Sequence, residues 1–154
     1  NSDSGYKLDT IEFEQCVLIG LEEKDQVQAK AFLEKGLKLY KGEYMPQRLY
    51  AEWCNHERER LQLIFLRGAE KLAQLSISMN NINSAIHWCD VILKKDKTWE
   101  EAYRLLMYCY YLKNNRPQRI KWYQKCCAVL HEELAVEPLP STKDMYEMII
   151  GTER

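Results

Sequence analysis

An internal repeat of 34 residues constrains the fold of this chain more than any other feature. When the sequence is shifted against itself by this period, Asn80-Asn81 falls on Asn114-Asn115. Apolar positions on both sides of these asparagines coincide as well. The coinciding pairs are Leu72 with Leu106, Ile86 with Ile120, and Trp88 with Trp122. Because the asparagines interrupt helical patterns, each copy is predicted to be two helices joined by a turn.

A helix–turn–helix unit of about 34 residues is the tetratricopeptide period. The second helix of that repeat usually carries a small residue, which Ala85 provides and Arg119 does not. An aromatic residue usually follows four positions later, where the chain has Cys89 in the first copy and Tyr123 in the second. We therefore expect two degenerate repeats, whose open ends are covered by flanking helices.

Apolar residues recur every three or four positions along the rest of the chain, a spacing typical of amphipathic helices. The expected helices run from a cap at Asp9 or Thr10 to about Leu21, from Asp25 to Tyr40, from Tyr50 to Met79, from Ser84 to Lys95, from Trp99 to Lys113, from Pro117 to near Val136, and from Asp144 to Ile150. The predicted fold is all-α: one tetratricopeptide-like, right-handed array of about seven helices.

Local signals refine the ends of these helices. Thr98 is expected to cap the fifth of them, and Ser141 or Thr142 the last. The segment 41–46 contains Gly and Pro and reads as a loop. Gly68, inside the longest helix, predicts either a kink or a close approach of another helix. The one predicted strand is a short stretch at 5–8.

Composition excludes several classes of function. Lys plus Arg number 22 and Asp plus Glu number 23, and a net charge of −1 argues against a surface devoted to nucleic acid. No apolar run approaches the ~20 residues that span a bilayer, and the polar start does not resemble a signal peptide. The six cysteines form no Cys-X-X-Cys pair, so we expect buried thiols in a reducing cytoplasm and no membrane partner.

The sequence offers little for catalysis or metal binding. It contains neither a Gly-rich phosphate loop nor a nucleophile elbow, and His56, His87 and His131 fit no zinc pattern. Cys127 and His131 would share a helix face, but a metal needs three or four ligands. Cys126 and Cys127 are adjacent and could bridge only with strain. We expect no enzyme activity, no cofactor and no metal site.

Basic residues gather between positions 113 and 125, where no acidic residue occurs. They are Lys113, Arg116, Arg119, Lys121 and Lys125. This basic stretch could contact phosphate or dock a partner. The plainer interpretation is an ordinary solvated helix face.

The helix predicted from Trp99 is apolar on more than one side, which usually means burial on both sides. Its second apolar stripe consists of Leu105, Tyr108, Tyr111 and Leu112. In a tetratricopeptide stack this stripe could line a groove for a peptide, a helix or a small ligand. Alternatively the last helix fills that groove, since Met145, Met148 and Ile149 must pack somewhere.

Read from end to end, the chain resembles the bacterial transcriptional activator domain, which follows a winged-helix DNA-binding domain in SARP-type regulators. The residues that carry the resemblance are Gly5-Tyr6-Lys7-Leu8, Asp9 to Phe13, Leu39-Tyr40-Lys41-Gly42, Tyr44-Met45-Pro46, Trp53, Glu57-Arg58, Leu61, Glu101-Ala102-Tyr103, Leu106-Met107, Tyr123, Leu130, Glu133-Leu134, Val136-Glu137-Pro138, Thr142 and Tyr146. Ala135 stands where the family usually has glycine.

The resemblance implies a division of the chain at its start. Residues 1–8 would be the end of a preceding winged-helix domain or a linker, and residues 9–151 the activator domain. It implies a cytoplasmic, non-catalytic module that packs against the winged helix of the same protein, helps dimers form, and reaches DNA only through the parent protein. The alternative is a sensor that binds a peptide or an unknown small ligand in the Tyr-rich groove. A free-standing scaffold is a third hypothesis.

Overall fold

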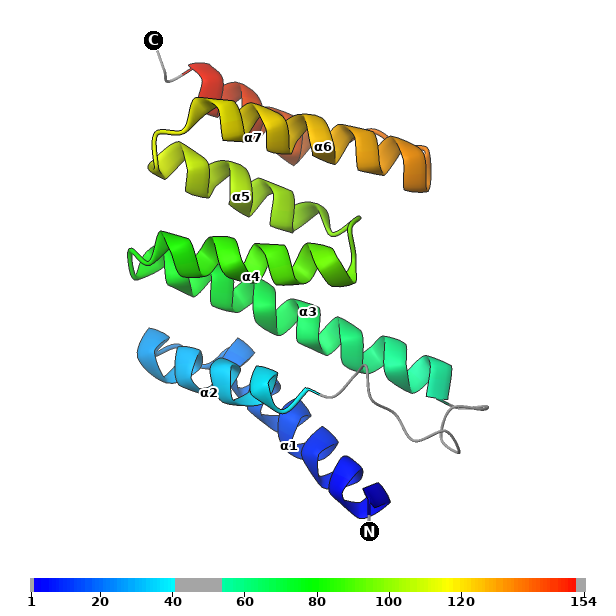
Figure 1. Ribbon diagram of the computed structural model, residues 1–154. Helices are drawn as coiled ribbons and strands as arrows, with labels where there is room; N and C mark the ends of the chain where they lie inside the picture. The colour runs from blue at the N-terminus through cyan, green and yellow to red at the C-terminus, as the bar shows by residue number, and fades with distance from the viewer. Residues whose placement is uncertain (1, 41–53, 152–154) are drawn as a thin grey trace. The chain divides into compact units, whose positions relative to one another are not determined.

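The computed structural model describes residues 2–40 and 54–151, and all regular structure in these ranges is α-helical, which confirms the predicted all-α class. The helices are α1 (Ser2–Glu22), α2 (Gln26–Lys38), α3 (Cys54–Ser78), α4 (Ile82–Lys95), α5 (Glu100–Leu112), α6 (Arg116–Leu134) and α7 (Pro140–Gly151) (Figure 1). None of them is both long enough and apolar enough to cross a membrane. The chain divides into two compact units, Asn1–Leu72 and Ala73–Arg154, and the boundary falls within α3. The predicted loop at 41–46 and Trp53 lie outside the described residues.

The start of the chain corrects the sequence prediction. The predicted strand at 5–8 and the predicted helix start at Asp9 or Thr10 are wrong, because α1 begins at Ser2 and runs through both without a break. An isolated strand leaves its backbone N–H and C=O groups unpaired, whereas a helix pairs them along its own length. In the described ranges no other extended segment is available to pair with residues 5–8.

Two predicted helix caps are also wrong. The N–H and the hydroxyl of Thr98 both donate to Asp96 Oδ1, at 2.9 and 2.7 Å, so Thr98 closes the preceding turn. Helix α5 is instead preceded by Trp99, whose side chain makes no capping hydrogen bond. The last helix begins at Pro140, which needs no hydrogen-bond acceptor for its nitrogen. Thr142 therefore lies within α7 and is fully buried.

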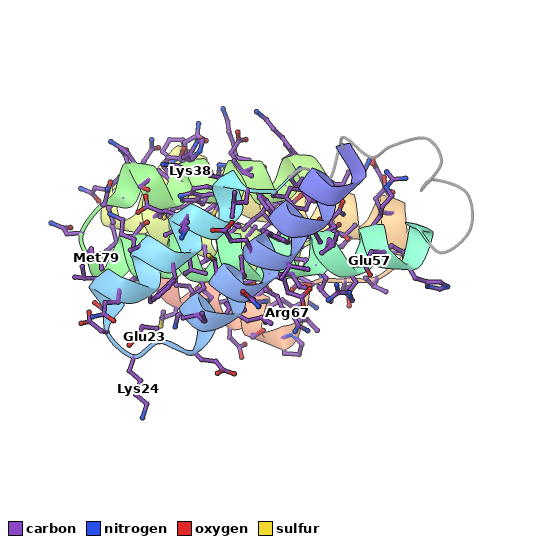
Figure 2. The ribbon with its side chains drawn as sticks, turned by 90° about the horizontal axis from the view of Figure 1, so that it is seen from below. Glu23, Lys24, Lys38, Glu57, Arg67 and Met79 are labelled. Carbon is purple, nitrogen blue, oxygen red and sulfur yellow. The ribbon has the colours of Figure 1, made fainter. Side chains whose placement is uncertain are left out.

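Close helix contacts hold the first unit together, and they depend on glycine. Val17 of α1 is fully buried between Gly36 of α2 and Gly68 of α3. A methyl group at either glycine would lie 2.9 Å from a Val17 methyl carbon, so the close-packing interpretation of Gly68 is confirmed. Between α1 and α2, Asp25 caps α2 by accepting from the Val27 N–H at 2.9 Å. Figure 2 shows Lys24 of this turn pointing away from the ribbon.

Helix α5 is the centre of the second unit, where it packs against α4, α6 and α7. Its buried residues are Ala102, Tyr103, Leu105, Leu106, Met107 and Cys109. Tyr103 packs with Cys126 and Leu130 of α6, and its hydroxyl donates to the backbone carbonyl of Lys97 at 2.7 Å. This hydrogen bond satisfies a polar group that would otherwise be buried without a partner.

The turns after α3 and α5 have the same construction, which confirms the predicted repeat. Asn80 and Asn114 adopt left-handed backbone conformations, with φ of 62° and 59°. The next residue in each turn, Asn81 or Asn115, donates its N–H to a carbonyl five positions back, at 2.7 or 2.8 Å. The side chain of that same residue accepts from the N–H three positions on and caps the following helix, α4 or α6. Each asparagine pair thus ends one helix and begins the next.

Candidate functional site

The predicted groove on α5 is only partly open. Leu105 is 8% exposed and belongs to the interior. Tyr108 and Tyr111 are half-buried, and their rings stack with centroids 6.2 Å apart and planes at 27°. Leu112 is 45% exposed. What remains accessible is a small apolar surface with two phenol groups, which we call the tyrosine surface (Tyr108, Tyr111 and Leu112).

Arg119 is buried, unlike the other members of the predicted basic stretch. It is 1% exposed, and its guanidinium carbon lies 5.5 Å from the centroid of the Tyr111 ring. It occupies the position on α6 at which tetratricopeptide repeats usually carry a small inward-facing residue, and the cation packs over an aromatic face instead. Arg119, the residue that departs from the repeat pattern, therefore packs against Tyr111 of the tyrosine surface.

The other members of the basic stretch, namely Lys113, Arg116, Lys121 and Lys125, are exposed. We call them the basic surface. Lys113 donates to the neutral side chain of Asn83 at 2.8 Å, and the Lys125 ammonium lies 5.0 Å from the Trp122 ring centroid. Lys121 and Lys125 are four positions apart on α6 and share one face. These cations are placed where they can meet an anionic partner.

A polar cluster joins α7 to α5, and the sequence did not reveal it. Glu100 Oε2 accepts from the Thr142 hydroxyl and from the N–H of Leu139 at 2.7 Å. Arg104 Nη1 donates to Thr142 Oγ1 at 2.8 Å and to Ser141 Oγ at 3.4 Å. We call these side chains, together with Glu101, the α5–α7 cluster. No local pattern links Thr142 to carboxylates some forty residues earlier, so only the fold brings them together.

Arg104 is held from both sides in the α5–α7 cluster. Its Nε donates to Glu101 Oε2 at 3.1 Å, and its Nη1 lies 3.7 Å from Glu100 Oε2. The Arg104 and Glu100 side chains are only 15% and 13% exposed. The two opposite charges therefore offset for one another the loss of hydration that burial causes. The contacts of this cluster are made within α5 and between α5 and the start of α7, which is a structural arrangement.

Burial lowers the reactivity of two thiols in the second unit, those of Cys109 and Cys126. Burial raises the pKa of the Cys126 thiol to about 12, and the nearby Glu100 carboxylate acts in the same direction. Burial likewise raises the pKa of Cys109 to about 11. Since the thiolate is the reactive form, both thiols are poor nucleophiles near neutral pH. Cys127 and His131 find no further ligands, because the described residues contain no convergent group of three or more metal-binding side chains.

Comparison with known proteins places this geometry in context. The family model of the bacterial transcriptional activator domain matches residues 8–150. Among solved structures, Mycobacterium tuberculosis EmbR in complex with a low-affinity phosphopeptide is similar, with a TM-score of 0.78 and 16% sequence identity over 94% of this chain. That similarity supports the tetratricopeptide-like helical fold. The chain spans 38% of the length of the EmbR chain. No curated protein matches the sequence significantly.

Proposed function

The chain belongs to the bacterial transcriptional activator domain family, and on that premise we propose that it acts through protein contacts beside a DNA-binding domain of the same regulator. The observation that carries this proposal is the family match over residues 8–150, together with a structure made of packed helices. Helical repeats present broad contact surfaces.

Two parts of the second unit are suited to contact a partner. The tyrosine surface combines apolar area with hydroxyl groups, which favours protein interfaces. The basic surface adds positive charge at Lys113, which directly follows Leu112, and at Arg116, Lys121 and Lys125 of α6. We propose that the tyrosine surface docks a protein and that the basic surface orients an acidic or phosphate-bearing partner. The plainer alternative for the basic surface remains solvation.

We also propose the partners and the place of action. Residues 1–8 join a preceding winged-helix domain, and residues 9–151 form the regulatory module that packs against it. DNA is contacted through that winged helix, and two copies associate when the regulator binds. Such a regulator acts in the cytoplasm. Helix α1 continues through residues 2–8 in the structure, so in the parent protein this junction would be helical unless the winged helix reshapes it.

A sensor is the second candidate, and the half-buried Tyr108–Tyr111 stack favours it. The similar EmbR structure contains a bound phosphopeptide. A peptide that used the tyrosine surface would bury the rings and Leu112, and the basic surface lies close enough in sequence to receive its charged groups. Binding would then stabilise one state of the regulator over another.

The experiment that tests the proposal separates DNA occupancy from activation. In the regulator that contains this chain, a Tyr108→Ala/Leu112→Ser variant is compared with a control in which Lys24→Glu changes an exposed residue of the first unit. Promoter occupancy and reporter transcription are measured for each. We expect the tyrosine-surface variant to retain occupancy and lose activation severalfold, and the control to retain both.

The outcomes distinguish the candidates. Full activation by the tyrosine-surface variant would contradict the docking role of that surface. A peptide that raises the melting temperature of the normal chain, and fails to do so for the variant, would favour the sensor, because a ligand that binds only the folded state stabilises it. A Lys121→Glu/Lys125→Glu variant tests the basic surface in the same assay and should weaken activation in a salt-dependent way.

A further inference from the structure

Helix α7 differs from its neighbours in how it is held. It lies beside α5 and α6 (Figure 1). Its buried residues are Thr142 and Ile149, whereas α5 buries six side chains. Met148 is 59% exposed. Because buried apolar area supplies most of the free energy that fixes a helix in place, α7 is anchored less firmly than α5.

Aromatic stacking adds to the apolar contact of α7. The Tyr146 ring of α7 lies parallel to the Tyr123 ring of α6, with centroids 3.9 Å apart and planes at 3°. Such a pair is worth about 0.5–1.5 kcal/mol beyond its buried area. It fixes the orientation of α7 but adds little to the cost of removing it.

The first turn of α7 depends on another helix for its hydrogen bonds. Glu100 of α5 accepts from the Leu139 N–H and the Thr142 hydroxyl, the role that a capping side chain within the same helix usually fills. The Thr142 oxygen in turn accepts from Arg104. Thr142 thus uses its hydroxyl as donor and acceptor at once, and it is fully buried.

The polar groups on α5 have partners even when α7 is absent. Arg104 is paired with Glu101 and lies within ion-pair distance of Glu100, and all three belong to α5. Release of α7 would leave these charges paired with one another and hydrated. A net intramolecular hydrogen bond is worth only about 0.5–1.5 kcal/mol, because water replaces the lost partner. These polar contacts therefore add only modestly to the cost of releasing α7.

From these contacts we propose that α7 is a releasable strap: it undocks as a unit while α4, α5 and α6 stay folded, and the Thr142 hydroxyl between Glu100 and Arg104 sets its docking equilibrium. Release uncovers Tyr123 on α6 and the Glu100–Arg104 side of α5. The strap gives the regulatory module two states. This inference rests on the packing of the second unit and holds whichever partner the module binds.

Native-state hydrogen exchange of the whole chain tests the proposal without any substitution. In low concentrations of urea, amides of 143–150 should exchange through an opening that is at least about tenfold more frequent than the opening of α5 and α6, with a much weaker urea dependence. Common exchange behaviour of α5, α6 and α7 would overturn the proposal, because the helices would then open together.

Substitution of Thr142 tests the role of its hydroxyl. Thr142→Val keeps the shape and removes the hydroxyl, which leaves Glu100 and Arg104 without this partner in the docked state, and it should speed exchange in α7 about 10- to 100-fold. The slowest amides of α5 and α6 exchange through states in which α7 is already released, so they should be accelerated by no more than the same factor. Thr142→Ser restores the hydroxyl and should restore slow exchange. Ser141→Ala, which removes only the 3.4 Å contact, is the matched control. Unchanged α7 exchange in Thr142→Val, or the same acceleration in Ser141→Ala, would contradict this role of the Thr142 hydroxyl.

Discussion

Among the described residues of the second unit, the helices α3, α5 and α6 are followed by a residue with a left-handed backbone: Asn80, Asn114 and Ala135, respectively. Asparagine tolerates this conformation, whereas alanine meets a clash between its Cβ and the following carbonyl. Ala135 nevertheless has φ of 54° and ψ of 39°, and the Val136 N–H bonds back to the Leu130 carbonyl at 3.3 Å. The geometry that glycine usually supplies is thus kept after glycine has been lost, at a cost in stability.

Ala135→Gly should therefore stabilise the chain. The substitution relieves the strain of a left-handed alanine and should raise the free energy of unfolding by about 1 kcal/mol. The matched control is Ala128→Gly, an exposed position inside α6, which should lower it by about the same amount. Urea denaturation measures both. A loss of stability at Ala135→Gly equal to that at Ala128→Gly would show that no strain is present.

Tyr103 should make the second unit sensitive to alkali. Burial raises the pKa of its phenol to about 12, above the ordinary value of about 10. Because the folded state disfavours the phenolate, the stabilisation that Tyr103 contributes is complete below about pH 10 and is lost as the pH rises toward 12.

Comparison with Tyr103→Phe isolates this effect. The variant loses the hydrogen bond to Lys97, which costs about 1 kcal/mol at pH 7. Between pH 10 and pH 11.5 the unfolding free energy of the normal chain should fall more steeply than that of the variant. Urea titrations at several pH values measure both slopes, and parallel curves would refute the assignment.

At the scale of helices, close approach distinguishes the first unit. A Cβ added at Gly36 would lie 2.9 Å from Val17 Cγ2, 3.0 Å from Cys16 Cβ and 3.2 Å from the backbone nitrogen of Val17. Two of these neighbours are near or within the backbone and cannot rotate away. Helices α1 and α2 can only separate to accommodate the extra atom.

Gly36→Ala should consequently destabilise the chain despite the better helix propensity of alanine. Overpacking costs about 1–3 kcal/mol, against a gain of roughly 1 kcal/mol from propensity. Gly151→Ala at the end of α7 meets nothing within 4 Å and should be neutral or slightly stabilising. Thermal unfolding of the two variants provides the measurement. Equal melting temperatures would contradict the close contact.

Local patterns predicted the elements better than their contacts. The asparagine turns were predictable because each turn is made by residues that adjoin in sequence. The cap of α7 was not, because Glu100 and Arg104 reach Thr142 from another helix. The burial of Arg119 did leave a signal: the 34-residue repeat aligns it with Ala85, which is also buried. The positive charge of Arg119 indicated an exposed residue, whereas its position in the repeat indicated a buried one.

At the scale of the whole molecule, we propose a division of labour between this chain and a DNA-binding domain. The chain carries a net charge of −1, and its basic surface is a small part of it. Contacts between basic side chains and phosphates supply most of the non-specific affinity for DNA, and the basic surface offers only four such side chains. The sequence predicted the family and the all-α fold class well, because the helical spacing and the family resemblance bear directly on them. Which of the candidate residues are accessible could be read only from the structure, since Leu105 and Arg119 are buried.

The isolated chain should bind DNA weakly and without sequence preference at physiological salt. We expect a dissociation constant no tighter than about 10⁻⁶ M for any duplex, the range of non-specific binding. Fluorescence anisotropy with a labelled promoter fragment and a shuffled duplex measures it. Tight binding that distinguishes the two duplexes would overturn the division of labour.

The most direct test of the central claim, that this chain is the regulatory module of a DNA-binding regulator, is to sequence the parent reading frame upstream of Asn1. The account predicts codons for a winged-helix domain that runs into residues 5–8. A reading frame that starts within a few residues of Asn1 would contradict it, and the sensor and the free-standing scaffold would then be the leading hypotheses.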